Sequence, residues 1–341
     1  MERFGSDVSH KIAMSASSAP RVAFVHRMLE HAISARFLRR HTFAHELFAK
    51  HEQQRPLGGG FVEWTTDGQL LYSYRVPRCV CIGHGGTMPL GAVVALVDEV
   101  TTWASLCVDR HHRPGVSISL EAELSQQQRP PVEGDQLIFA ARVEKLGRTL
   151  GFQSCEIHDA ATGRRVARGY HTKMLDMGRA WSLMLGPLFP LTERLVTTFS
   201  AASRPAPAID PHDATALERL LAPTSTQVDG STCVSGFSCV PQMLQETNIM
   251  FGGAQAMVHE VAARAAAETA LQRSEPAASI APVHCSSMLV RYLAGAGLGD
   301  QLEAHATASM IYRGEGVAAT SRLVRAGVER SSAEMQFVRS D

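Results

Sequence analysis

One pattern of elements occurs twice along the chain, and it restricts the fold more than any other feature of the sequence. The first copy has a strand-like hairpin around Asp67–Gly68, a long apolar segment at 90–108 and then several strand-like segments separated by turns. The second copy has a strand-like segment at 231–244, an Ala-rich segment at 254–272 and again a run of strand-like segments. An ordered repeat of this length indicates duplication of one structural unit.

The two copies also match at single residues. In the first copy Gly91 opens the apolar segment and Asp98 follows seven residues later, and in the second copy Gly253 and Glu260 have the same spacing. Downstream, Ser117 in the first copy parallels Cys285 in the second. Chance could produce one such match, but an ordered series favours duplication.

The segment at 90–108 is apolar on nearly every side, and a helix of this kind has to be buried. A long helix followed by antiparallel strands is an α+β layout. We therefore expect two tandem units, each with a long central helix wrapped by an antiparallel β-sheet, at 56–178 and 226–341. A Pro-, Ala- and Ser-rich stretch predicts a linker at 179–225.

Residues 1–55 form an N-terminal extension whose role has two readings. Its part at 8–45 has six basic residues, one acidic residue and an amphipathic pattern, which is typical of a mitochondrial transit peptide. The alternative is one or two helices that pack on the first unit. Localisation therefore stays open between mitochondrial and cytoplasmic.

Composition excludes several classes of protein. The 341 residues contain 33 Lys and Arg against 33 Asp and Glu, and this zero net charge argues against binding nucleic acid through a positive field. No apolar run reaches the roughly 20 residues of a membrane-spanning helix. The seven cysteines are scattered, so we expect buried reduced thiols, including the CxC pair Cys79 and Cys81 on one face of a strand. No metal or redox cofactor is implied.

Asp98 and Glu260 each stand inside an otherwise apolar helical segment. A carboxylate in such a position is costly, so it needs a functional role or a solvated or paired stripe of the helix. Both explanations remain open for both residues on this pattern alone.

Five motifs of the first copy resemble the hotdog-fold acyl-CoA thioesterases of the phenylacetate-pathway and acyl-coenzyme A thioesterase 13 type. They are HGG (84–86), GAVVALVDEV (91–100), PGVSI (114–118), GRTLGF (147–152) and RGYHTK (168–173). The second copy is similar but more divergent, through NIMFGGAQAMVHE (248–260) and RYLAGAGLGD (291–300). The resemblance implies a double hotdog in one chain, which is a pseudo-dimer, with acyl-CoA or another acyl-thioester as substrate. A homodimer of such double hotdogs is possible.

The resemblance also implies catalytic roles, because in this family the carboxylate of one unit works with the glycine turn of the other. Hydrolysis needs a general base and donors for a developing oxyanion, and free amides at a helix N-terminus can supply such donors. One expected site combines Asp98 and Ser117 with Asn248, Gly252 and Gly253. The other combines Glu260, with Cys285 or Ser286, and the turn His84, Gly85 and Gly86. A gap-free alignment instead puts Gly91 at the glycine turn and leaves His84 in the preceding loop. Neither set is complete, but the set with Asp98 and Ser117 is the fuller one, so we predict that this site is competent and the Glu260 site is degenerate.

Basic residues near the strand turns, Lys145, Arg148 and Lys173, are candidates for binding the phosphates of coenzyme A, against the alternative of solvated turn residues. Two competing functions remain. A hotdog hydratase is disfavoured because the loops before the helices have no adjacent Asp/His dyad. A non-catalytic acyl-thioester binder or scaffold protein would retain the fold and lose the chemistry.

Overall fold

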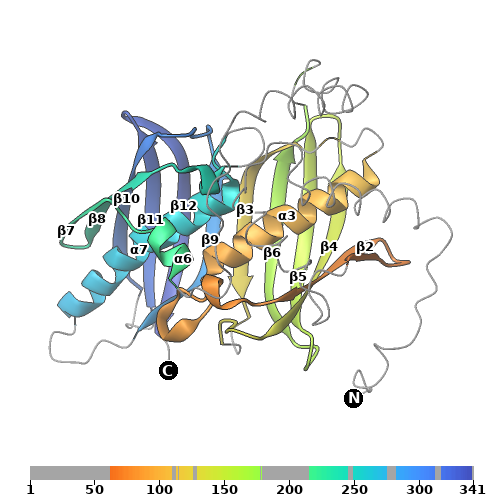
Figure 1. Cartoon of the computed structure of the whole chain (residues 1–341), viewed down its shortest axis with the longest axis horizontal. Helices are drawn as coiled ribbons and strands as arrows, with labels where there is room; N and C mark the ends of the chain where they lie inside the picture. Colours follow the sequence, from red (N-terminus) through yellow and green to blue (C-terminus); the bar gives the residue numbers. More distant parts are fainter. Residues whose placement is uncertain are drawn as a thin grey trace.

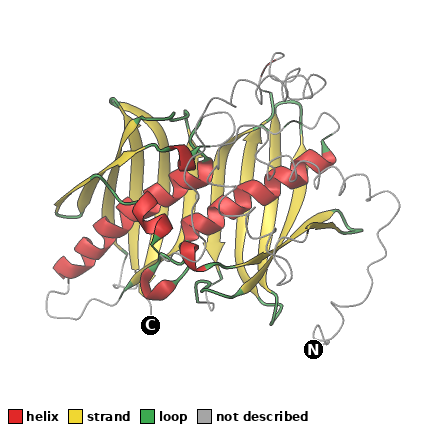
Figure 2. Ribbon diagram, in the orientation of Figure 1, coloured by secondary structure: helices red, strands yellow, loops and turns green. Residues whose placement is uncertain are grey.

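The computed structural model describes residues 62–109, 113, 115–125, 129–176, 178, 215–244, 249–274, 282–311 and 316–339. These residues form a twelve-stranded antiparallel sheet with two long helices, α3 (Leu90–Val108) and α7 (Gly252–Ser274), on the same face (Figures 1 and 2). The chain therefore has a helical layer covering one face of a single sheet.

The strand order has the same form when it is read inward from either edge of the sheet. From one edge the order is β1 (Val62–Trp64), β2 (Gln69–Arg75), β4 (Gln136–Leu146), β5 (Leu150–Asp159), β6 (Arg165–Met174) and β3 (Val116–Leu124). From the other edge it is β7 (Ser225–Asp229), β8 (Thr232–Ser238), β10 (Gln301–Met310), β11 (Gly316–Arg325), β12 (Val328–Arg339) and β9 (Val283–Tyr292). In each half the long helix follows the second strand of that half.

The two halves of the sheet join through β3 and β9. Ser119 lies opposite Arg291, and Glu123 lies opposite Ser287. This pairing is symmetric. Ser119 of β3 corresponds to Ser287 of β9 and Glu123 corresponds to Arg291, so exchanging the two halves turns the first pair into the second. The same exchange relates Ser117 to Cys285 and Leu124 to Tyr292.

The two helices approach most closely at glycines. A Cβ on Gly91 would lie 2.9 Å from the Met257 Cα, and a Cβ on Gly253 would lie 2.6 Å from the Ala95 Cα. Both separations are below normal van der Waals contact, so only glycine lets the helical backbones meet at these two points. The N-terminal turn of each helix is thereby held against the second turn of the other.

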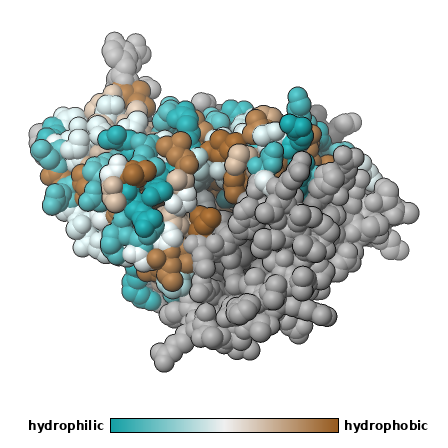
Figure 3. All heavy atoms as spheres, turned by 90° about the horizontal axis from the view of Figure 1, so that it is seen from above, coloured by the Kyte–Doolittle hydropathy of each residue, from teal (hydrophilic) through white to brown (hydrophobic). Residues whose placement is uncertain are grey.

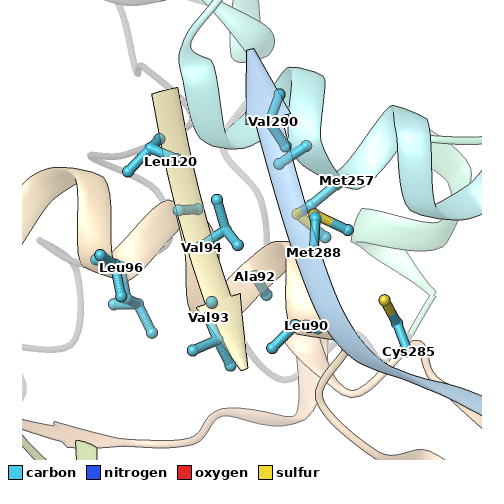
Figure 4. Packing of buried hydrophobic residues seen from close by; sticks show 14 of the residues in the cluster. Leu90, Ala92, Val93, Val94, Leu96, Leu120, Met257, Cys285, Met288 and Val290 are labelled. Atoms are coloured by element: carbon cyan, nitrogen blue, oxygen red, sulfur yellow. The ribbon is translucent and has the colours of Figure 1, made fainter. Parts of the chain in front are cut away.

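The core lies between the sheet and the two helices. Figure 4 shows Leu90 and Val94 of α3, Leu120 of β3, and Met257 of α7 with Met288 of β9 gathered around the junction of the halves. All five are almost completely buried. The strands alternate buried and exposed residues, which is the pattern of a sheet with one covered face.

The long helix of the first half begins and ends where the sequence predicts. Pro89 is extended, and its carbonyl accepts the amides of Ala92 and Val93 as α3 begins. At the other end, the Asp109 carboxylate accepts hydrogen bonds from the amide and the side chain of Arg113. By length and composition α3 is apolar enough to cross a membrane, and most of it is buried inside the protein.

The predicted hairpin around Asp67–Gly68 is confirmed, with Gly68 at φ +84° between β1 and β2. The CxC prediction is wrong in part. Cys79 lies in the 3-10 turn η2 (Arg78–Val80), because Pro77 has no N–H with which to continue the ladder of β2. Within the described ranges none of the seven cysteines is in a disulfide, and six are buried while Cys81 is half-buried.

The end of the predicted linker at 179–225 also needs correction. A short helix, α6 (Ala216–Leu220), and the first residue of β7 lie within it, and Leu217 and Leu221 are buried in the core. Most of the linker and the whole extension at 1–55 lie outside the described residues. In Figure 3 the molecule is seen from above, and on this face the apolar and polar residues of the described part are interspersed.

Candidate active site

Asp98 and Ser117 lie next to each other between the helix and the sheet of the first half. Asp98 lies in the middle of α3 with 5% of its surface exposed, and Ser117 is on β3 beneath it. The Ser117 hydroxyl donates a hydrogen bond to Asp98 Oδ1 over 3.1 Å. The sequence placed Ser117 in the same expected site as Asp98, and the structure shows the two residues hydrogen-bonded.

His171 of β6 completes a polar network around these two residues. Its Nε2 lies 3.0 Å from Ser117 Oγ and 3.5 Å from Asp98 Oδ1, and its Nδ1 lies 2.7 Å from Thr101 Oγ1. A proton on Nε2 suits the neighbouring carboxylate, whereas a lone pair there would be repelled by it. Ser117 therefore lies between the imidazole of His171 and the Asp98 carboxylate, and Thr101, whose hydroxyl donates to the Val97 carbonyl over 2.5 Å, holds the other side of the imidazole.

The N-terminal turn of α7 faces Asp98 from the other half of the sheet. A Cβ on Gly252 would lie 2.8 Å from Asp98 Oδ2, so glycine is needed for the carboxylate to come this close. The predicted pairing of Asp98 and Ser117 with Gly252 is thus present in the structure. Gly253 follows at the helix crossing, while Asn248 lies outside the described residues.

Burial and charge set the protonation of this network. Burial raises the pKa of Asp98, and the charge of Lys173 and the Ser117 hydrogen bond oppose that rise. Burial, reinforced by Lys173, holds the pKa of His171 well below its ordinary value, so its imidazole is neutral. Asp98 can therefore accept a proton, while His171 orients Ser117 and carries no charge.

Lys173 lies inside the protein, 3% exposed, where its Nζ donates to Thr102 Oγ1 over 2.6 Å. Burial lowers the pKa of Lys173, and the negative charges of Asp98 and Glu99 partly oppose this fall. The sequence placed Lys173 near a strand turn as a phosphate ligand, but its side chain points inward from β6. Of the proposed phosphate ligands, Arg148 and Lys145 are exposed.

The exposed turn His84–Gly86 forms a separate 3-10 element, η3, that precedes α3. Gly91 instead occupies the first turn of α3, as the gap-free alignment expects. Its amide donates to Glu260 Oε2 over 2.6 Å. Glu260 therefore meets Gly91 in the structure.

Glu260 is 1% exposed and is held on both sides. Its Oε1 accepts a hydrogen bond from Arg264 over 2.7 Å, and its Oε2 accepts the Gly91 amide. Cys285 occupies the place of Ser117: burial and the Glu260 carboxylate raise its thiol pKa, and its Sγ donates to the Ser287 carbonyl. Ser286 is directed to the Gln336 carbonyl on the neighbouring strand.

His171, Thr101 and Tyr292 belong to the Asp98 site and were not assigned roles from the sequence. Tyr292, at the end of β9, donates to the Gly252 carbonyl over 2.9 Å. The strand period could have placed His171 and Lys173 on one face of β6, because they are two residues apart. Among the described residues, no group of three or more His, Cys, Asp or Glu side chains is arranged to hold a metal ion.

The sequence is similar to that of a characterised enzyme over part of its length. It is 38% identical over 90 residues to human acyl-coenzyme A thioesterase 13, a match that covers 26% of this chain and 61% of the relative. The chain thus spans less than two thirds of the relative that it matches. No protein-family model matches the chain.

Solved structures share the arrangement of sheet and helices over most of the chain. A protein of Alicyclobacillus acidocaldarius with a hot dog fold has a TM-score of 0.51 at 12% identity, covering 82% of this chain and 96% of its own. The TesB protein of Mycobacterium avium has a TM-score of 0.53 at 10% identity, with coverage of 82% and 96%. The chain therefore has the hot dog fold of the Alicyclobacillus acidocaldarius protein, and it shares this arrangement with the TesB protein.

Proposed function

We propose that the protein hydrolyses acyl-CoA thioesters to the free acid and coenzyme A. The observation that carries this proposal is the contact between the buried Asp98 carboxylate and Gly252 at the start of α7. A base and a helix N-terminus, contributed by different halves of the sheet, meet there. The match of 90 residues to human acyl-coenzyme A thioesterase 13 also supports the proposal.

In the proposed reaction, ionised Asp98 removes a proton from a water molecule, whose oxygen attacks the thioester carbonyl carbon. The first-turn amides of α7, which have no intrahelical acceptor, hold the oxygen that becomes negative. Collapse of the tetrahedral intermediate breaks the carbon–sulfur bond, and the coenzyme A thiolate takes the proton that Asp98 received from water, which restores the ionised base. Ser117 and His171 keep Asp98 directed toward this point.

We further propose that the chain consists of two hotdog units in tandem and that one of its two potential sites is active. Two repeated half-sheets, each with a long helix, and the symmetric pairing of β3 with β9 support the tandem arrangement. The Glu260 carboxylate already accepts the Gly91 amide and pairs with Arg264. It thus takes the place that a substrate carbonyl oxygen would need, which makes the second site structural.

Thiol release from a panel of acyl-CoAs, followed with a chromogenic thiol reagent, tests the proposal. Asp98→Asn keeps the shape of the side chain and removes the base, so we expect kcat/KM to fall about 10²- to 10⁴-fold. Glu260→Gln is the matched control, since an amide oxygen can still accept the Gly91 amide, and we expect activity within a few-fold of wild type.

The two alternatives give different results. If Glu260→Gln abolishes activity and Asp98→Asn does not, the assignment of the two sites is reversed. If the wild-type protein binds acyl-CoAs saturably and releases no thiol, the protein is a non-catalytic acyl-thioester binder. Thermal unfolding of each variant shows whether a loss of activity reflects a loss of folded protein.

A further inference from the structure

Tyr292 bonds the peptide unit that opens α7. Its hydroxyl donates to the Gly252 carbonyl over 2.9 Å, and a Cβ on Gly252 would lie 3.3 Å from that hydroxyl. This carbonyl belongs to the same planar peptide unit as the Gly253 N–H. Because the two ends of the unit point in opposite directions, a hydrogen bond at the carbonyl fixes the direction of the amide.

We infer that Tyr292 is a positioning residue for the oxyanion donor of the Asp98 site, an inference that rests on the proposed function. It acts through the Gly252–Gly253 peptide unit, which it orients and polarises. A hydrogen bond accepted by a peptide carbonyl makes the N–H of the same unit a stronger donor. Tyr292 thus adds a residue from the second half of the sheet to a site whose base comes from the first half.

The other half of the molecule has no such tyrosine. The symmetric β3–β9 pairing relates Tyr292 to Leu124, whose side chain cannot donate a hydrogen bond. The matching peptide unit is Leu90–Gly91, and its amide donates to Glu260. The hydroxyl that bonds the helix-opening carbonyl is therefore present at the Asp98 site, and the corresponding residue at the Glu260 site, Leu124, has none.

Tyr292→Phe removes the hydroxyl and keeps the ring that packs against the core. We expect kcat for acyl-CoA hydrolysis to fall about tenfold with KM within twofold of wild type, since one well-placed donor in an oxyanion site affects the rate strongly. Tyr170→Phe is the control, because Tyr170 is an exposed tyrosine on β6. Its kinetic constants should not change.

A binding measurement separates this inference from the proposed function. It compares a non-hydrolysable ketone analogue of an acyl-CoA with the thioether analogue that has no carbonyl oxygen. We expect Tyr292→Phe to weaken binding of the ketone about three- to tenfold and to leave binding of the thioether unchanged. This readout does not depend on turnover, whereas a purely structural role would weaken both analogues equally.

Each outcome decides one of the two statements. If wild type hydrolyses acyl-CoAs and Tyr292→Phe changes neither kcat nor ketone binding, the inference fails and the function stands. If wild type hydrolyses none of them and Tyr292→Phe still weakens ketone binding alone, the function fails and the inference stands. Equal weakening of both analogues overturns the inference, and failure of wild type to bind either one overturns both.

Discussion

Lys173 and Asp98 carry opposite charges inside the protein, and each changes the protonation of the other. The cation opposes the rise that burial causes in the pKa of Asp98, and Asp98 opposes the fall that burial causes in the pKa of Lys173. A base whose pKa is raised loses its activity at a higher pH than an ordinary carboxylate would. Removing Lys173 should therefore raise the pKa of Asp98 further.

We predict that Lys173→Met moves the acidic limb of the kcat/KM profile toward higher pH, because protonated Asp98 is inactive as a base. The direction follows from losing a positive charge that favours the carboxylate form. If Lys173 bound coenzyme A phosphates, the same change would instead raise KM at all pH values. Arg148→Ala, at an exposed turn, is the comparison, since an effect confined to KM there would indicate phosphate binding.

The sequence predicted Asp98 and Ser117 as candidate site residues, and it did not identify His171 and Tyr292 beside them. A lone carboxylate in an apolar helix stands out, because burial of an unpaired charge is costly. His171 and Tyr292 do not stand out, since a single polar residue in an alternating strand is ordinary. Only the pairing of β3 with β6 and β9 brings them to Asp98, and that register depends on contacts distant in the sequence.

The crossing of α3 and α7 depends on two glycines that occupy corresponding places. A side chain on Gly91 would meet the Met257 backbone, and one on Gly253 would meet the Ala95 backbone. Neither neighbour can move without shifting a helix. The crossing therefore fixes how far the start of each helix lies from the acid of the other.

We predict that Gly91→Ala and Gly253→Ala each lower the free energy of unfolding by about 1–3 kcal/mol, as overpacking does in a close-packed core. The better helix propensity of alanine, worth about 1 kcal/mol, would act in the opposite direction. Denaturant unfolding measures the change, with Glu268→Ala on the exposed side of α7 as control. Stability equal to wild type in both glycine variants would show that the helices can separate at no cost.

The helix at 90–108 and the run of strands after it could be predicted because their patterns are long and regular. The end of the linker could not, because α6 has five residues and its burial depends on the tertiary contacts of Leu217. The CxC segment failed for a related reason. Its alternation resembles a strand, but Pro77 stops the ladder before the cysteines.

If the two halves are tandem units, as proposed, joining them in one chain lets them diverge, and the surroundings of the two acids differ in this way. Asp98 remains next to a glycine, a serine and a histidine, whereas Glu260 is bound to an amide and an arginine. A symmetric dimer of identical subunits could not adopt this difference, because every substitution would occur in both sites. In the proposed tandem arrangement, the covalent link would therefore permit one site to become a structural support for the other.

Each half also buries a neutral histidine, and this affects the stability of the whole molecule. His259 lies on α7 between the hydroxyls of Ser321 and Ser331, at 2.9 Å from each, and is completely buried. Burial lowers its pKa to about 3. His171 in the other half is shifted in the same direction.

We predict that the folded state loses stability as the pH falls below the ordinary histidine pKa of about 6.5. Between that pH and about 3 the unfolded chain takes up a proton at His259 that the native protein does not, so stability falls by up to about 1.4 kcal/mol per pH unit. His259→Gln removes this proton uptake, and denaturant unfolding at pH 7 and pH 5 should show a smaller loss than in wild type. Asp98 acts in the opposite direction but equally in both proteins, so it cancels in the comparison. An unchanged pH dependence in His259→Gln would mean that the buried imidazole is not kept neutral.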